Sequence, residues 1–443
     1  MDILEKSLEM LEKYPLCNNC LGRQFALLGH GLENEARGEA IKLILTMKAH
    51  QTTLANKEAG VALLKTLAAN GASSIAVQTL QTVKRKVSKA KQCCLCNGKM
   101  ELTPELANEA AKMLKDYEYS TFLVGVELPT EVEEREDELR AEFDLNFSES
   151  MRNEFSRIIG KAISELNDKT VEFKRPDITI LINPFTKHIS LQVNPLHIAG
   201  RYRKLARGVS QSRWICHKCQ GRGCKKCNWT GKMYLESVED FIAEPALKMT
   251  NGQAAVFHGA GREDIDARML GNGRPFVIEV KTPKNRSINL ETLEKTVNKH
   301  AKGKVEVQDL RFADKEIVRQ LKNAENSQKS YQVIVEFNRS IADEELTRLE
   351  TSLKGILIKQ QTPKRVLHRR ADRLREKYIY KAKVERLTPN RARLNVTCQG
   401  GLYVKELVTG DDGRTRPSVA EILETAAIPL ELDVLKVITR ERK

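Results

Sequence analysis

Residues 257–276 read FHGAGREDIDARMLGNGRPF and hold acidic side chains between glycines. Two glycines stand on each side of the acidic centre: Gly259 and Gly261 before it, Gly271 and Gly273 after it. Glycine adopts turn conformations that other residues resist, so this pattern predicts a loop that displays carboxylates between two flexible turns. The β-branched run VIEV at 277–280 predicts a strand at the loop's exit. Asp264 is the candidate catalytic acid and Asp266 the alternative, while a solvated surface charge is the competing interpretation.

The chain carries an excess of positive charge. Lys and Arg number 74 against 59 Asp and Glu, which gives a formal net charge of +15. Residues 196–232 contain ten Lys or Arg and no acid, and residues 361–383 contain nine against Asp372 and Glu376. Such concentrated positive stretches favour a polyanionic partner, with nucleic acid as the first candidate. In the first stretch the candidate RNA-binding residues are Arg201, Arg203 and Lys204.

The composition is that of a soluble globular protein, with 41% hydrophobic and 30% charged residues. No apolar run approaches the ~20 residues of a membrane helix, and residues 1–17 lack the apolar core of a signal peptide. We therefore expect a cytoplasmic protein that does not contact a membrane. The 443 residues are enough for about three domains.

Eight of the ten cysteines stand in pairs separated by two residues. Disulfides are rare in the cytosol, so such pairs there indicate metal binding. The first two pairs bracket a helical stretch and predict one four-thiolate structural zinc site, with buried thiols lacking metal as the alternative. The four candidate ligands of this site are Cys17, Cys20, Cys93 and Cys96. The two cysteines outside all pairs, to which we assign no role, are Cys94 and Cys398.

The other two pairs lie in CHKCQGRGCKKCNWTG at residues 216–231. Gly221 and Gly223 between them let the chain wrap tightly around one ion. Four thiolates fill a tetrahedral shell and leave no position for water, so the predicted zinc is structural and the surrounding cations form a basic finger. The four candidate ligands are Cys216, Cys219, Cys224 and Cys227.

Hydrophobic periodicity divides the chain into regions of an α+β multidomain protein. Residues 1–100 are expected to be helical and to carry the first zinc site. Residues 101–210 are expected to form an α/β module, in which Ile178, Ile180 and Ile182 share one face of a strand. A zinc knuckle at 211–235 and a mixed-sheet domain at 236–443 follow.

The α/β module ends in a strand, a turn and a second strand, followed by Arg201-Tyr202-Arg203-Lys204. This order resembles a THUMP domain, the RNA-binding module of several tRNA-modifying enzymes. The resemblance implies that residues 101–210 bind RNA.

Three segments of the last region resemble the pseudouridine synthases. They are GREDIDARMLGNGRPF at 261–276, PKRVLHRRAD at 363–372 and GLYVKELVTGDDGRT at 401–415. The closest resemblance is to the archaeal tRNA pseudouridine(54/55) synthase family, whose members have a zinc-bearing, THUMP-containing region before a catalytic domain. It implies isomerisation of uridines 54 and 55 of the tRNA T arm by a monomeric enzyme that flips the target base. Such chemistry needs no organic cofactor, only the structural Zn²⁺.

The resemblance also implies which acid attacks. Pseudouridine synthases share an Arg-x-Asp arrangement, which Arg262 and Asp264 provide, whereas Asp266 lacks the upstream arginine. Asp264 is then the nucleophile, at C1′ of the ribose or C6 of the base, and Arg262 helps to hold the flipped nucleotide.

Other substrate contacts follow from the same resemblance. Tyr331 is expected to pack on the flipped base and Tyr403 to be a second contact, unless either is a core tyrosine. Lys405 resembles the basic residue that pairs with the nucleophile, unless it is a solvent-facing lysine, and Leu432 resembles the apolar residue of the uracil pocket. The run at 361–383 resembles a loop that grips RNA, or else is a solvated charged face. The gripping residues are expected to be His368, Arg369 and Arg370.

Two other functions compete with this interpretation. A THUMP-bearing methyltransferase or thiolation enzyme would need a GxGxxG turn or a GxxxxGK[ST] loop, and the sequence contains neither. A non-enzymatic zinc-bearing RNA-binding protein accounts for the charge and the cysteines but leaves the loop at 257–276 without a purpose.

Overall fold

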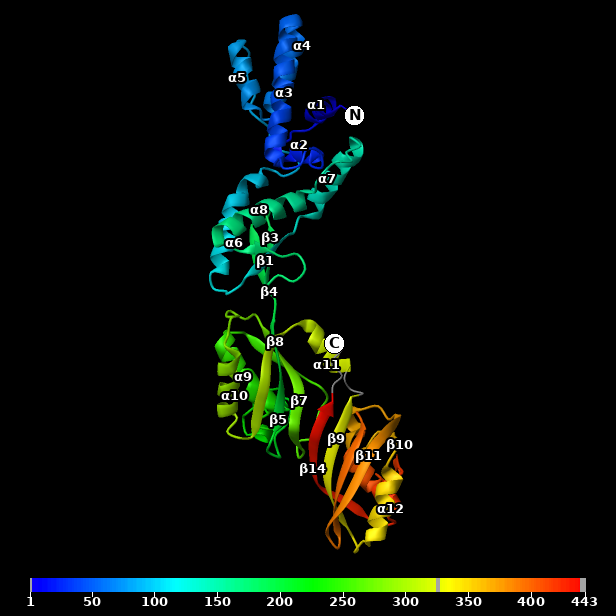
Figure 1. The fold of residues 1–443 in the computed structure, drawn as a ribbon. Coiled ribbons are helices and arrows are strands. Elements are labelled where there is room, and N and C mark those ends of the chain that lie inside the picture. The colour runs from blue at the N-terminus through cyan, green and yellow to red at the C-terminus, as the bar shows by residue number, and fades with distance from the viewer. Residues whose placement is uncertain (1, 324–326, 439–443) are drawn as a thin grey trace. The chain divides into compact units, whose positions relative to one another are not determined.

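The computed structural model describes residues 2–323 and 327–438, and the chain divides into two compact units, Met1–Asn194 and Pro195–Lys443 (Figure 1). Each unit has its own hydrophobic core. In the described residues, no helix combines the length and apolar character needed to cross a bilayer.

The first unit begins with a group of helices. They are α1 (Ile3–Lys13), α2 (Asn18–Gly22), η1 (Arg23–Phe25), α3 (Asn34–Ala55), α4 (Lys57–Ala69) and α5 (Ser74–Thr82). Side chains of Asp2, Asn56 and Ser73 accept backbone N–H groups at the starts of α1, α4 and α5, and so satisfy donors that have no partner within the helix. A Cβ atom on Gly22 would lie 1.9 Å from the Asn34 oxygen, so glycine there permits α2 to pack against α3.

The rest of the first unit is a small sheet covered by helices. The helices are η2 (Lys99–Leu102), α6 (Thr103–Leu114), α7 (Thr130–Glu142) and α8 (Met151–Asn167). The strands are β1 (Thr121–Val126), β2 (Thr170–Val171), β3 (Ile178–Asn183) and β4 (His188–Val193), in the order β2-β1-β3-β4. Ile178, Ile180 and Ile182 are fully buried, as their alternation predicts, and they share a core with Phe155 and Ile159 of α8.

The second unit is organised around a ten-stranded sheet of order β13-β10-β11-β12-β9-β14-β7-β5-β8, with β6 also paired to β7. Its strands are β5 (Leu196–Lys204), β6 (Ala254–Gly259), β7 (Arg268–Lys281), β8 (Val305–Ala313), β9 (Gln328–Phe337), β10 (Ile356–Gln361), β11 (Leu374–Thr388), β12 (Arg391–Gln399), β13 (Thr415–Arg416) and β14 (Ala427–Ile438). Two antiparallel halves meet where β14 and β7 pair in parallel, over only Asp433 with Arg268 and Val434 with Met269.

Helices cover both halves of this sheet (Figure 1). The helices of the unit are η3 (Lys225–Cys227), α9 (Val238–Thr250), α10 (Leu290–His300), α11 (Lys315–Asn323), α12 (Asp343–Leu353), η5 (Lys364–Arg369), α13 (Val404–Thr409) and α14 (Val419–Ile422). Helices α9 and α10 pack on the half that contains β5 to β8, and α12 packs on β11. The loops where the two halves meet, around β7 and β14, carry the residues of the site described below.

Strand β5 corrects the expected division of the chain. Residues Leu196–Lys204 were expected at the end of the α/β module, yet they pair with β7 on one side and β8 on the other. Ile198 and Tyr202 are fully buried in the core of the second unit. A strand with partners on both sides belongs to the sheet that buries it.

The expected second turn of the acidic loop is also different. Gly271 and Gly273 lie within β7, which begins at Arg268, well before the VIEV run. Both have positive φ, and a Cβ on Gly271 would lie 1.9 Å from the oxygen of Leu435 in β14. Gly271 therefore allows β14 to approach β7 closely, and Gly273 lies against the backbone of Tyr202 in β5.

Candidate active site

The acidic loop runs from the end of β6 to the start of β7 and is anchored by a buried carboxylate. Glu263 receives hydrogen bonds of 2.9 Å from the Tyr202 hydroxyl and forms an ion pair of 2.8 Å with Arg274. Gln211 Nε2 donates to the Tyr202 hydroxyl and to the Gly261 oxygen, both at 2.8 Å. Burial raises the pKa of Tyr202 well above its usual value, which keeps its proton available for Glu263.

Lys204 binds the backbone of the same loop through its buried ammonium group. Its side chain is fully buried, and Nζ donates to the backbone oxygens of Val209 at 2.8 Å, Asp264 at 3.0 Å and Ile265 at 3.2 Å. Burial lowers the pKa of Lys204. The expectation that Lys204 binds RNA is therefore wrong, because its ammonium group faces the backbone of the loop.

The two acids of the loop have different cationic partners. Arg365 donates to Asp264 through Nη1 at 3.2 Å and lies 3.1 Å from its other oxygen through Nη2. Lys405 binds Asp266 at 2.6 and 2.8 Å and lies 3.6 Å from Asp264. The Asp264 side chain is 33% exposed against 67% for Asp266, so Asp264 is the more enclosed of the two. Lys405 thus lies nearer the alternative acid than the expected nucleophile.

A cavity of about 280 Å³ opens beside Asp264. Seven of the predicted site residues line it: Arg262, Asp264, Tyr331, Arg370, Tyr403, Lys405 and Leu432. Further cations line it as well: Arg274, Lys329, Arg365, Arg375 and Lys377. Glu263 and Asp264 are the acids among the lining residues. The cavity therefore suits a ligand with an uncharged part, which contacts the apolar side chains, and an anionic part, which contacts the cations.

Tyr331 and Leu432 reach the cavity from the neighbouring strands β9 and β14. Tyr331 pairs with Val434, and Leu432 pairs with Val333 two residues along. Tyr331 is half-buried and borders the cavity, so it is not a tyrosine enclosed in the core, and burial raises its pKa. An aromatic ring and a leucine in one cavity can enclose a flat ring.

Tyr403 stands at the other side, at the start of α13. Gln360 fixes its backbone, accepting from the Tyr403 N–H at 2.8 Å and donating to its oxygen at 3.0 Å. The Tyr403 hydroxyl accepts a hydrogen bond of 3.1 Å from Arg370. The Arg365 guanidinium lies 5.9 Å from the Tyr403 ring centroid. Tyr403 therefore joins the basic segment around η5 to the cavity.

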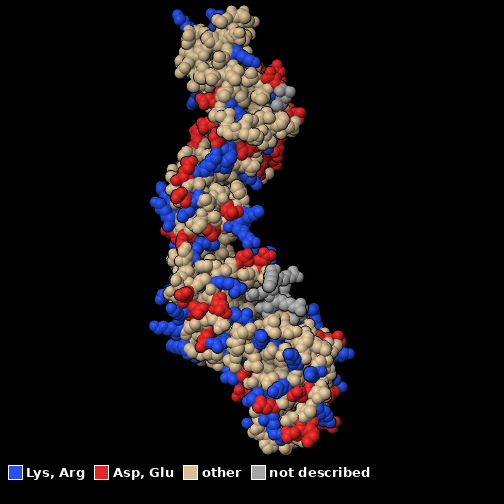
Figure 2. All heavy atoms as spheres, in the orientation of Figure 1, with Lys and Arg blue, Asp and Glu red and all other residues tan. Residues whose placement is uncertain are grey.

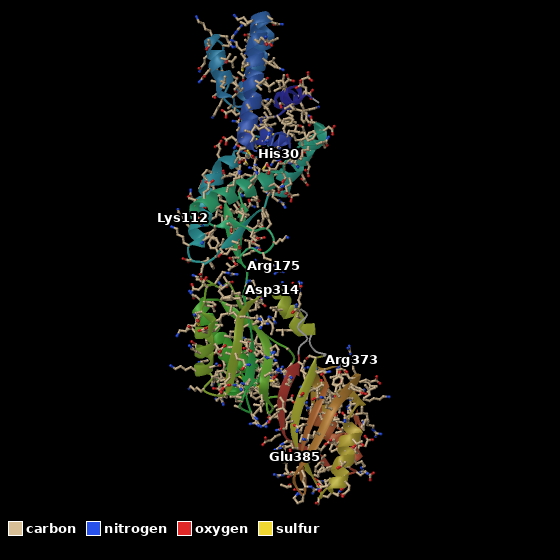
Figure 3. All side chains as sticks on the ribbon, in the orientation of Figure 1. His30, Lys112, Arg175, Asp314, Arg373 and Glu385 are labelled. Atoms are coloured by element: carbon tan, nitrogen blue, oxygen red, sulfur yellow. The ribbon has the colours of Figure 1, made fainter. Side chains whose placement is uncertain are left out.

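Strand β11 brings two of the cavity's cations. Arg375 and Lys377 lie near the end of the strand that Arg373 precedes, whereas Glu385 lies toward the other end (Figure 3). The Lys377 Nζ lies 3.2 Å from the position of a Cβ on Gly401, whose φ of +91° favours glycine. The positive end of β11 thus borders the cavity.

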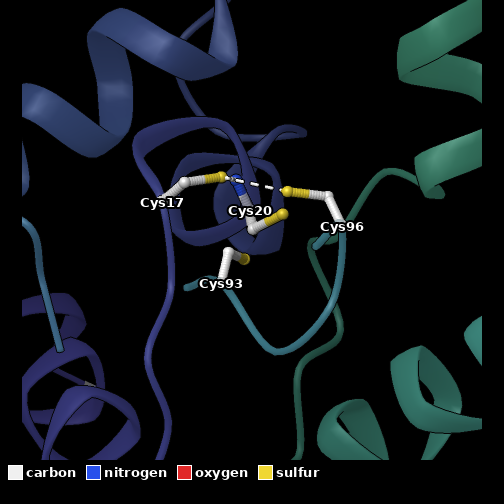
Figure 4. Close-up of side chains that lie close together, drawn as sticks. All are labelled: Cys17, Cys20, Cys93 and Cys96. Atoms are coloured by element: carbon white, nitrogen blue, oxygen red, sulfur yellow. Dashed lines mark hydrogen bonds between the residues drawn. The ribbon is translucent and has the colours of Figure 1, made fainter. Parts of the chain in front are cut away.

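Eight of the ten cysteines form two sets of four, and within each set the sulfur atoms lie within 4.8 Å of one another. In the first set, shown in Figure 4, Cys17 and Cys96 Sγ are 3.6 Å apart. In the second, three sulfur pairs are 3.7 to 3.9 Å apart. Zn–S bonds of ~2.3 Å in a tetrahedron separate sulfurs by about 3.8 Å, so both sets fit zinc.

Comparison with known proteins decides the family. Residues 106–183 match the family model "Pus10 THUMP domain, archaeal", and residues 197–438 match "Pus10, C-terminal". The chain belongs to the Pus10 family of tRNA pseudouridine synthases. It is thus an isomerase of RNA and not a methyltransferase or thiolation enzyme. The two Pus10 matches fall within separate units of the chain.

Relatives named tRNA pseudouridine synthase Pus10 match almost end to end. That of Methanocaldococcus jannaschii is 46% identical over 97% of this chain and 93% of its own length. That of Methanothrix thermoacetophila is 41% identical, with coverage of 98% and 94%, and that of Pyrococcus furiosus is 38% identical, with coverage of 98% of both. The solved Cbf5-Nop10-Gar1 complex shares 15% identity over 43% of each chain at a TM-score of 0.28.

The remaining predicted residues of this Pus10 protein lie outside the cavity lining. Arg201 donates to the backbone oxygens of Asn272 and Gly273, and Arg203 forms an ion pair with Glu306. His368 is exposed, and the side chain of Arg369 lies outside the described part of the structure. Acidic and basic residues are interspersed on the face shown in Figure 2.

Arg365 and the anchor of Glu263 were not predicted from the sequence. Arg365 is 101 residues from Asp264, and its only signal was its place in the run PKRVLHRRAD. Arg262 was expected to hold the nucleotide. Its guanidinium also lies 5.0 Å from the Trp214 ring, so it contacts the segment just before Cys216, the first cysteine of the second set.

Proposed function

We propose that this protein converts uridines 54 and 55 of the tRNA T arm to pseudouridine with Asp264 as the nucleophile. The observation that carries this proposal is the position of Asp264 on the rim of a cavity that also contains Tyr331 and Leu432. A carboxylate beside an enclosure for a flat ring is what a nucleophilic mechanism of this isomerisation requires.

The reaction rearranges one nucleoside. The N1–C1′ bond breaks, the uracil turns, C5 joins C1′, and the proton on C5 leaves while N1 gains one. Asp264 adds to C1′ of the ribose or to C6 of the uracil, and the resulting covalent intermediate divides the step. There is no redox change and no group transfer, so no organic cofactor takes part.

The target base must leave its stack to reach Asp264. A cavity of about 280 Å³ is near the lower end of small-ligand pockets, ~300 Å³. This size suits a single pyrimidine better than a base pair, which supports base flipping. In this arrangement Tyr331 packs on the base, Leu432 closes the apolar side, and Arg262 and Tyr403 hold the nucleotide.

The cations around the cavity supply the RNA contacts. Arg370 binds Tyr403 and continues the exposed segment that contains His368, so these residues are placed to grip phosphates beside the flipped nucleotide. We assign RNA binding also to residues 106–183, which match the THUMP model, and to the basic knuckle at 216–231.

The remaining assignments complete the proposal. Both cysteine sets hold structural Zn²⁺, because four thiolates leave no position for water. We assign 1–100 to a zinc-binding region, 101–194 to the THUMP-like module, and 195–443 to the catalytic domain with its knuckle. The protein acts as a cytoplasmic monomer.

Replacement of Asp264 tests the proposal. Asp264→Asn and Asp264→Ala remove the attacking oxygen, so pseudouridine formation on an unmodified tRNA transcript should fall below detection while the tRNA dissociation constant stays near that of the wild type. Asp266→Asn is the matched control and should keep appreciable activity. An active Asp264→Ala with an inactive Asp266→Asn would move the nucleophile two residues, and activity in both would exclude this loop as its source.

A further inference from the structure

Besides the buried Glu263, the acidic loop carries Asp264 and Asp266, and each of these two acids has its own cation from another part of the chain. Lys405 lies 1 Å closer to Asp266 than to Asp264, at 2.6 against 3.6 Å. Both oxygens of Asp264 instead face the guanidinium of Arg365, at 3.2 and 3.1 Å. An arginine fork that contacts both oxygens of a carboxylate fixes its plane, which a lysine ammonium cannot do.

Arg365 is itself fixed from its other edge. Its Nε donates to Glu406 Oε1 at 2.6 Å, and the Glu406 side chain is almost fully buried in α13. Glu406 follows Lys405 directly in the chain, so the partners of both loop acids depend on the same short helix. With Nε held by Glu406, the two terminal nitrogens of Arg365 point toward Asp264.

The segment that carries Arg365 is held at neighbouring residues. The backbone N–H of Lys364 donates to Asp411 at 3.0 Å, and Val366 is buried at the cavity. The same segment continues to His368 and Arg370. The cation that meets Asp264 therefore comes from the part of the chain to which we assign RNA binding.

We propose that Arg365 is the positioning residue for Asp264, that Glu406 orients Arg365, and that Lys405 chiefly holds Asp266. This inference rests on the proposed role of Asp264 as nucleophile. Before attack, the guanidinium contacts both oxygens of the carboxylate and fixes its orientation beside the cavity. When one oxygen bonds to carbon, the carboxylate loses its charge and the ion pair weakens; when that bond breaks, the pair forms again.

The test compares Arg365→Gln, Arg365→Lys and Arg365→Ala in the full-length protein. We expect single-turnover pseudouridine formation to fall about 100-fold in Arg365→Gln, the scale of a misplaced reacting group. Arg365→Lys restores a charge without the fork and should recover about tenfold of that loss. The tRNA dissociation constant should change less than about threefold. Glu406→Gln should slow the same step less, because the amide oxygen of glutamine can still accept the hydrogen bond from Arg365 Nε but without the charge.

Two further measurements separate positioning from folding. Millimolar guanidinium should raise the rate of Arg365→Ala and leave Asp264→Ala inactive, an outcome that a purely structural arginine would not give. The matched control is Arg339→Gln, which removes an arginine bound to both oxygens of Glu345, at 2.6 and 3.0 Å, outside the cavity lining. Its rate should equal that of the wild type.

The outcomes are distinguishable from those that test the nucleophile. If Asp264→Ala is inactive and Arg365→Gln reacts at the wild-type rate, the positioning role is wrong and the nucleophile stands. If Asp264→Ala is active, the proposed function fails. If Arg365→Gln unfolds, the other two variants decide. The inference is overturned if guanidinium does not raise the rate of Arg365→Ala and Arg365→Lys is inactive.

Discussion

Cations of the second unit that lie in similar basic stretches of the sequence have different binding partners in the structure. Lys204 is buried and binds three backbone oxygens, whereas Arg365 is partly exposed and binds a carboxylate. A buried ammonium group is stabilised by hydrogen bonds to the acceptors around it. A partly exposed guanidinium is stabilised by its two parallel hydrogen bonds to a carboxylate. Net charge alone therefore does not say which cation meets RNA.

Lys204 gives the first test at this scale. Lys204→Met leaves the oxygens of Val209, Asp264 and Ile265 without their donor, so we expect the free energy of unfolding to fall by about 1–3 kcal/mol. The loop that carries Asp264 should also loosen, with a fall in single-turnover rate of about tenfold or more. Denaturant unfolding and rapid-quench kinetics measure the two effects.

The control for this prediction is the same substitution on an exposed strand residue. Lys359 lies in β10 with an exposed side chain, so Lys359→Met should change stability by less than about 0.5 kcal/mol. Equal stability of the Lys204 and Lys359 variants would show that the buried ammonium does not hold the loop.

At the scale of elements, the site depends on how closely β14 approaches β7. These strands pair over only two residues, and Gly271 of β7 lies against the backbone of Leu435. Asp433, beside Leu432, accepts from Arg268 at 2.9 and 2.6 Å and from Arg207 at 2.8 Å. The ion pairs and the glycine together place the β14 end that carries Leu432 next to the acidic loop.

Gly271→Ala tests this close approach. Its Cβ would lie 1.9 Å from the Leu435 oxygen, in a conformation of positive φ, so β14 must shift. Gly303→Ala is the matched control, because Gly303 also has positive φ but no atom within 4 Å of its Cβ position. We expect about 1 kcal/mol of destabilisation for Gly303→Ala and about 1–3 kcal/mol more for Gly271→Ala. Thermal unfolding of both variants measures the difference, and equal melting temperatures would contradict it.

The sequence predicted local features of these elements better than their partners. The alternation of Ile178, Ile180 and Ile182 predicted a shared buried face, because the period of a strand is a local property. Strand β5 was assigned to the wrong region, since nothing in Leu196–Lys204 identifies β7 and β8 as its neighbours. Gly271 was taken for a turn residue because the approach of Leu435 is invisible in the local pattern.

The same distinction applies to the site. Asp264, Tyr331, Lys405 and Leu432 were expected in one site from the family resemblance, and the structure brings them to one cavity. Arg365 and Glu406 were not expected there, because pairing across 101 and 41 residues depends on the completed sheet. Long-range pairing is thus the part of the site that sequence patterns leave undetermined.

At the scale of the whole molecule, each of the two units contains one set of four cysteines. The first set closes the chain between Cys17 and Cys96, 79 residues apart, and the second folds residues 216–227 into a knuckle. Ordering a long segment costs more conformational entropy than ordering a short one. The first set should therefore matter more to the folding of its unit.

Metal analysis tests this division. The wild-type protein should contain two zinc ions per chain, and Cys20→Ser and Cys219→Ser should each contain one, since the sets lie in separate units. Cys20→Ser should lower the melting temperature more than Cys219→Ser, and the losses should add in the double variant, because the sites share no ligand. Cys94→Ser, outside both sets, is the matched control and should keep both ions. Loss of both ions in Cys20→Ser would show instead that the two units depend on one another to fold.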